Sequence, residues 1–83
     1  MAVDYSQGRY NVFKGRGPLA PLIGRIDEDE YVTSLSGELL YRVDGSEFYE
    51  VNGRYLGEIT PTEDGLATVV DANHYCLFVI APE

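Results

Sequence analysis

The sequence predicts an all-β fold: a small closed or nearly closed antiparallel barrel of four β-hairpins with a pseudo-fourfold repeat. The first observation is a repeated unit of a short strand, a Gly or Asn turn and a more apolar strand. Its turns fall at Gly15, Gly37, Gly53 and Asn73. The second is that residues with high strand preference recur in short runs, while no segment of useful length shows helical periodicity. Short strands at near-regular spacing, separated by turn signals, are typical of a sandwich or a barrel.

Eight strands are expected in chain order, near residues 9–14, 20–26, 30–35, 38–43, 47–51, 54–59, 66–70 and 75–80. Asn52-Gly53 is the strongest hairpin signal, because a tight primed turn needs positive φ at both of its central residues. We expect residues 1–8 to form a flexible N-terminal arm and residues 9–83 to form a single β domain of four hairpin repeats.

The second strand of each hairpin predicts the core, because alternate residues of a strand share one face. Twelve uncharged positions are expected to point inward: Leu22, Gly24, Ile26, Leu39, Tyr41, Val43, Tyr55, Gly57, Ile59, Tyr75, Leu77 and Val79. The middle inward positions of the four strands alternate in size: Gly24, Tyr41, Gly57 and Leu77. Such alternation of small and large side chains fills the tapered interior of a small barrel. We expect Tyr41 and Leu77 to meet across the barrel axis.

Several short units of this sequence resemble those of a known family. They are Val43-Asp44-Gly45, Tyr49-Glu50-Val51-Asn52-Gly53 and Asn52-Gly53-Arg54-Tyr55-Leu56-Gly57-Glu58-Ile59. With them the chain resembles the 4-fold beta flower family of small bacterial domains, best over residues 31–59. It departs from that pattern in the Thr60–Gly65 loop, the expanded first turn and the absence of Trp. The resemblance implies a fold only, and it brings no catalytic residues.

Composition narrows the function classes. The chain of 83 residues has a formal net charge of −8, which argues against direct nucleic-acid binding and against binding to anionic membranes. Cys76 is the only cysteine, so no disulfide forms within one chain. The lone thiol and the absence of a signal-peptide pattern predict a cytoplasmic protein. The longest apolar run, Tyr75 to Ala81, is too short to span a bilayer.

Two clusters carry groups that could do chemistry. Asp27-Glu28-Asp29-Glu30 offers oxygen ligands, but it lacks the glycine and the spacing of a calcium-binding loop, so we expect a solvated connection. Asp71, His74 and Cys76 are the parts of a nucleophilic triad, but residues two apart on a strand are usually too distant to hydrogen-bond. A half-buried thiol beside a turn histidine is the expected arrangement. We expect no catalytic residue, no cofactor and no metal.

The leading functional hypothesis is a small, non-enzymatic interaction module that binds a protein partner or a second copy of itself. Its expected interface consists of the outer apolar positions Ile23, Leu40 and Leu56, framed by Arg25, Arg42 and Glu58. The alternative for these positions is that residues 9–13 or 60–65 fold over them and make them internal.

Two other functions remain open. One is an acidic inhibitor that mimics nucleic acid and blocks a basic groove, with carboxylates such as Glu28, Glu30, Glu47, Glu50 and Asp64 on one face. The other is a small-ligand-binding barrel, in which Gly24 and Gly57 open a niche at one end.

Overall fold

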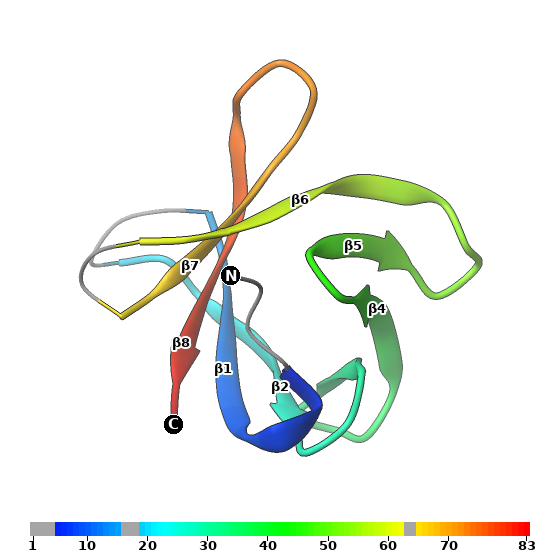
Figure 1. Cartoon of the computed structure of the whole chain (residues 1–83). Helices are drawn as coiled ribbons and strands as arrows, with labels where there is room; N and C mark the ends of the chain where they lie inside the picture. Colours follow the sequence, from blue (N-terminus) through cyan, green and yellow to red (C-terminus); the bar gives the residue numbers. More distant parts are fainter. Residues whose placement is uncertain (1–4, 16–18, 63–64) are drawn as a thin grey trace.

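The computed structural model of the chain is a closed barrel of eight antiparallel strands (Figure 1). It describes residues 5–15, 19–62 and 65–83. The strands are β1 (Arg9–Lys14), β2 (Leu22–Asp27), β3 (Tyr31–Ser34), β4 (Leu39–Asp44), β5 (Glu47–Glu50), β6 (Tyr55–Pro61), β7 (Ala67–Val70) and β8 (Cys76–Pro82). Each strand pairs with its neighbours in the chain, and β1 pairs with β8, which closes the sheet. The all-β prediction is therefore confirmed. Among the described residues, no helix has the length and apolar character needed to cross a membrane.

The strand order divides the barrel into two ends. Because neighbouring strands are antiparallel, the turns β1–β2, β3–β4, β5–β6 and β7–β8 lie at one end, which we name the turn end. The connections β2–β3, β4–β5 and β6–β7 lie at the other, the connection end, together with the C-terminus. In Figure 1 the β7–β8 turn reaches upward, away from the C-terminus at the bottom of the view.

Three hairpin turns share one backbone geometry. The amide of the fourth turn residue donates to the carbonyl of the first: Gly37 to Ser34 (3.0 Å), Gly53 to Glu50 (2.9 Å) and His74 to Asp71 (3.0 Å). The donor residues have positive φ, at 95°, 97° and 65°. The primed turn predicted at Asn52-Gly53 is wrong, because only Gly53 of the pair has positive φ. A three-residue loop needs one left-handed residue at its end. His74, rather than Asn73, supplies it in the last hairpin.

Each hairpin also contains one β-bulge, and the four bulges follow equivalent residues. The pairing shifts after Val12, Val32, Phe48 and Val69. Opposite each shift the second strand carries one residue without a register partner, namely Ile23, Leu40, Leu56 and Leu77. An extra residue of this kind bends its strand and increases the local twist. These four apolar residues are therefore the points at which the sheet curves into a barrel.

Eight buried side chains of the core pair across the sheet between hairpins. The pairs are Val12 with Ile80, Val32 with Ile26, Phe48 with Val43 and Val69 with Ile59, and all eight are at most 3% exposed. Burial of a side chain of this size contributes roughly 1.5–3 kcal/mol. Four of the eight belong to the first strand of a hairpin, and the prediction from the second strands did not include them.

The predicted inward positions are correct only in part. Gly24, Ile26, Val43, Gly57 and Ile59 are buried, and Leu22 and Tyr41 are half-buried. The first position is wrong in the other three hairpins: Leu39, Tyr55 and Tyr75 are 53%, 52% and 69% exposed. For Leu39 and Tyr55 the physical reason is the bulge, because one extra residue breaks the alternation on which the prediction rested.

In the last hairpin the predicted inward positions are displaced by one residue. Phe78 and Ile80 are buried, whereas Leu77 and Val79 are only half-buried. Phe78 therefore takes the place predicted for Leu77, and its ring lies 4.9 Å from the Tyr41 ring, centroid to centroid. The strand equivalent to Leu22–Ile26 is Cys76–Ile80, since both carry their bulge at the second residue.

The described part of the segment before β1 packs against the barrel, and whether residues 1–8 form a flexible arm stays a prediction. Tyr5–Gln7 forms a 3-10 helix, η1, and the Tyr5 side chain is 4% exposed. The Tyr5 ring packs edge-on against Tyr10 with centroids 5.0 Å apart. The Glu28 amide donates to the carbonyl of Gly8 (2.9 Å). Residues 1–4 lie outside the described residues.

Gly24 and Gly57 are positions at which the neighbouring backbone leaves no room for a side chain. A Cβ at Gly24 would lie 2.5 Å from the Thr33 carbonyl oxygen, and one at Gly57 would lie 2.4 Å from the Val70 oxygen. Both glycines stand directly after a bulge residue. They permit backbone contact at the bend, so they do not open the niche that the ligand-barrel hypothesis expected.

We expect Gly57→Ala to destabilise the barrel by roughly 2–3 kcal/mol, because a strand must move to admit the methyl group. Gly53→Ala is the matched control, since a Cβ there meets nothing within 4 Å and only the φ of +97° opposes it. We expect that control to cost about 1 kcal/mol. Urea unfolding of both variants measures the difference. Equal losses for the two variants would contradict the close approach at Gly57.

Candidate binding surfaces

The turn end carries nearly all of the strongly exposed, large apolar side chains. Among the described residues, six of the seven lie in or beside a hairpin turn: Leu19, Leu35, Leu39, Val51, Tyr55 and Tyr75. The seventh, Tyr31, begins β3 at the connection end and is the least exposed of them at 39%. Scattered exposed apolar residues are ordinary, but their concentration at one end of a small domain is typical of a contact surface.

A cavity of about 340 Å³, the turn-end cavity, opens on the same end. It is lined by Lys14, Tyr41, Glu50, Leu56, Leu77 and Phe78. The rings of Tyr41 and Phe78 continue inward to Phe48, with centroids 5.2 and 5.1 Å from the Phe48 ring. Lys14 and Glu50 place one charge of each sign at the cavity, whose other side chains are largely apolar. This arrangement suits an apolar group bordered by polar or charged neighbours.

The predicted interface residues fall into two groups in the structure. Ile23, Leu40 and Leu56 are half-buried bulge residues on three different strands, and Ile23 and Leu56 pack against the core. Arg25, Arg42 and Glu58 are exposed on the same strands, and Arg42 forms an ion pair with Asp44 (3.8 Å). The bulges bring Leu56 together with Leu77 in the turn-end cavity. Whether these six residues bind a partner stays a prediction.

Several cavity residues could not be assigned from alternation alone. The predicted inward positions in the last hairpin were displaced by one residue, so Leu77 was placed in the core instead of Phe78, and Lys14 and Glu50 were not predicted to lie at one cavity with them. The sequence does contain a signal that identifies the bulges. In every second strand two apolar residues stand next to each other before the middle position, as in Leu22-Ile23 and Leu39-Leu40. Adjacent apolar residues at the same point of each repeat indicate a break in alternation.

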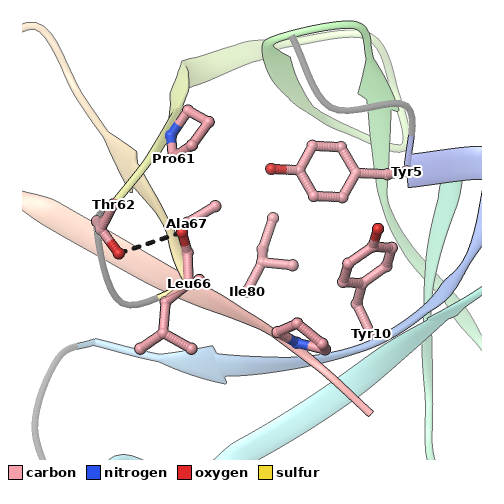
Figure 2. A pocket seen from close by; sticks show the side chains of 9 residues that line it. Tyr5, Tyr10, Pro61, Thr62, Leu66, Ala67 and Ile80 are labelled. Carbon is pink, nitrogen blue, oxygen red and sulfur yellow. Dashed lines mark hydrogen bonds between the residues drawn. The ribbon is translucent and has the colours of Figure 1, made fainter. Parts of the chain in front are cut away.

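A second cavity, of about 200 Å³, lies at the connection end (Figure 2). Its lining is largely apolar: Tyr5, Tyr10, Pro61, Thr62, Gly65, Leu66, Ala67, Ile80 and Pro82. Figure 2 shows the Tyr5 hydroxyl directed across the cavity toward Pro61 and Ala67. The Thr62 hydroxyl donates a hydrogen bond to the Leu66 carbonyl oxygen (3.2 Å). We name this space the connection-end cavity.

Two tyrosine hydroxyls have a raised pKa for different physical reasons. Burial, with a smaller contribution from Tyr10, raises the pKa of Tyr5 to about 12. At Tyr49 the main cause is a hydrogen bond, because the hydroxyl donates to Glu47 Oε2 at 2.6 Å and this raises the pKa. Tyr5 therefore keeps its proton, and its capacity to donate a hydrogen bond, throughout the neutral range.

Acidic residues concentrate at the connection end. Asp27, Glu28, Asp29, Glu30, Asp44, Glu47 and Glu83 lie there, and Arg9 pairs with Asp27 at 2.9 Å. At the turn end Lys14 and Arg54 partly balance Glu38, Glu50 and Asp71. The carboxylates expected for nucleic-acid mimicry are divided, since Glu28, Glu30 and Glu47 lie at the connection end and Glu50 at the turn end. Asp64 lies outside the described residues.

The two clusters considered for chemistry take structural roles. Asp29 Oδ1 accepts a hydrogen bond from the Tyr31 amide (3.0 Å), and Asp71 Oδ1 accepts bonds from the amides of Asn73 (2.9 Å) and Tyr75 (3.0 Å). His74 occupies the left-handed turn position, while Cys76 is half-buried. In the part of the chain that the structure describes, no three His, Cys, Asp or Glu side chains are grouped so as to hold a metal ion.

Comparison with protein-family models, curated proteins and solved structures finds no match for this chain. The assignment of a function therefore depends on the geometry and chemistry of the two ends of the barrel.

Removal of the buried hydroxyl in Tyr5→Phe should make the protein more resistant to alkali. A tyrosine whose pKa rises on folding contributes stability in full below its unfolded value near 10, and loses it as the pH approaches 12. Wild-type stability should therefore fall between pH 10 and pH 12 more steeply than that of Tyr5→Phe. Chemical unfolding at pH 8 and pH 11 measures this, with Tyr75→Phe as the control because Tyr75 is 69% exposed. Parallel behaviour of all three proteins would show that Tyr5 is not buried.

Proposed function

We propose that this chain is a non-enzymatic interaction module that binds a partner protein through its turn end. One observation carries the proposal: six exposed apolar side chains gather at the turn end, where an apolar cavity of about 340 Å³ also opens. Binding energy in protein interfaces concentrates where a few large side chains enter well-packed pockets. Tyr55 and Tyr75 are residues of the type that supplies such contacts.

The partner that fits this surface is a basic protein that presents one apolar side chain to the cavity. The rings of Tyr41 and Phe78, which pack on the buried Phe48, accept that side chain, and Lys14 and Glu50 pair with polar groups beside it. The net charge of −8 opposes association of two copies of the chain and favours a partner of opposite charge. A basic partner is therefore favoured over self-association.

We also propose that the barrel is a pseudo-fourfold repeat of the 4-fold beta flower type. The support is the equivalent bulge in all four hairpins and the left-handed residue at the end of three of their turns. The expected cytoplasmic location and the expected lack of catalysis stay predictions. The mimicry alternative is less favoured, because its carboxylates are divided between the two ends.

The turn-end proposal can be tested with a basic peptide that carries one central phenylalanine between lysines. In an NMR titration of the isotope-labelled protein, we expect shifts to concentrate at Lys14, Leu56, Leu77 and Phe78. The double variant Leu39→Ser/Tyr55→Ser should weaken binding at least about fivefold, since a hot-spot residue is worth more than about 1 kcal/mol. These side chains are half exposed, so the fold should persist.

Two controls separate the turn end from general charge attraction. Tyr31→Ser removes an exposed aromatic residue at the connection end and should leave binding unchanged. A peptide with alanine in place of the phenylalanine should lose most of its affinity. Shifts confined to the connection end, or no difference between the two peptides, would contradict the proposal. Dimerisation through the turn end, detected by light scattering, would identify a second copy as the occupant instead.

A further inference from the structure

We propose that the connection-end cavity binds a small, neutral, largely aromatic molecule that accepts one hydrogen bond from the Tyr5 hydroxyl. This site is separate from the turn end and does not depend on the function proposed for it. The cavity lies between the end of β6, the start of β7, the end of β8 and the Tyr5 side chain (Figure 2).

The space exists because one position of the barrel carries a small residue. Ala67 and Tyr10 each stand two residues before a buried valine, at equivalent points of β7 and β1. At the Tyr10 position an aromatic ring occupies the space at this end of the barrel. At the Ala67 position, which pairs with Pro61 and Ile80, the methyl side chain leaves that space empty. The resulting cavity of about 200 Å³ exceeds the roughly 150 Å³ of an engineered apolar cavity that binds benzene. A single aromatic ring with a short substituent therefore fits.

The lining defines the chemistry of the ligand. Pro61, Leu66, Ala67, Ile80 and Pro82 supply apolar walls. The rings of Tyr5 and Tyr10, packed edge to face, supply an aromatic surface against which another ring packs well.

The Tyr5 hydroxyl is directed into this space, toward Pro61 and Ala67 (Figure 2). Because it remains protonated in the neutral range, it can serve as a donor to a ketone, ester or ether oxygen.

Charge around the site selects against anions. Among the described residues that line the cavity none is charged, so these residues offer no ionic partner to a charged ligand that has lost its hydration. Two carboxylates belong to residues near the lining. Glu83 follows the lining residue Pro82, and the Glu28 amide donates a hydrogen bond to the carbonyl of Gly8, two residues before the lining residue Tyr10. These carboxylates repel an anionic ligand as it approaches. The ligand is accordingly neutral.

Acetophenone is the probe, because it combines one aromatic ring with one acceptor oxygen. Toluene lacks the acceptor, and benzoate replaces it with a negative charge. In NMR titrations of the labelled protein, acetophenone should give saturable shifts at Tyr5, Tyr10, Ala67 and Ile80. Tyr5→Phe should weaken acetophenone about three- to tenfold, as loss of one hydrogen bond does, and should leave toluene unchanged. Benzoate should bind at least about tenfold more weakly than acetophenone.

Ala67→Leu fills the cavity and should abolish the binding of both neutral probes. The matched control is Ala72→Leu, the same substitution at an exposed position of the turn end, which should bind as the wild type does. If Ala67→Leu does not fold, Ala67→Val replaces it, and the Tyr5→Phe comparison still decides. Non-saturable shifts with both neutral probes, or full acetophenone binding by Ala67→Leu or Ala67→Val, would overturn the proposal. Equal loss of toluene and acetophenone affinity in Tyr5→Phe would also overturn it, because the hydroxyl would then not be the donor.

Discussion

Closure of a sheet within so short a chain requires every hairpin to bend sharply, and the four β-bulges provide that bend. Each bulge adds one residue to the second strand of a hairpin, at Ile23, Leu40, Leu56 or Leu77. The twist that a bulge adds allows β1 to meet β8, so that the edges of the sheet disappear. Glycine beside two of the bulges lets backbone approach backbone, while Tyr41 and Phe78 fill the space beside the other two.

The same bends give the two ends of the barrel their different chemistry. At the turn end the first residue of β4 and β6 projects outward beyond the bulge, so Leu39 and Tyr55 are exposed around a cavity lined by large apolar side chains. At the connection end the acidic connections carry most of the charge, and Tyr5 packs against Tyr10 beside a smaller cavity. These two ends are the surfaces that we propose for a protein partner and for a small molecule.

The sequence predicts the strands and the closed architecture well, because turn residues and strand-forming runs are local signals. It predicts the inward residues less well. Alternation is valid only up to a bulge, so Leu39 and Tyr55 were placed inside and Leu56 outside. The run of seven largely apolar residues from Tyr75 to Ala81 contains no charged residue to show which side chains point outward. Leu77 was therefore predicted to be inward in place of Phe78.

The two cavities lay beyond the reach of sequence patterns. The turn-end cavity combines residues from five strands, and the connection-end cavity depends on a tyrosine in a segment that resembles a loose arm. Such sites arise from contacts distant in the chain, which no local signal records. The exposed acidic connections, in contrast, follow directly from the charge of the Asp27–Glu30 run.

Four bulged hairpins close into one barrel only if β1 lies beside β8, so the contact between these two strands is the decisive observation. An NMR measurement of short interproton distances is suited to this test, because antiparallel neighbours bring their backbone protons close together. In a closed barrel we expect cross-strand contacts between Val12 and Ile80, together with contacts between Val12 and Gly24. Contacts between Val12 and Gly24 without any between Val12 and Ile80 would show an open sheet instead of a closed barrel.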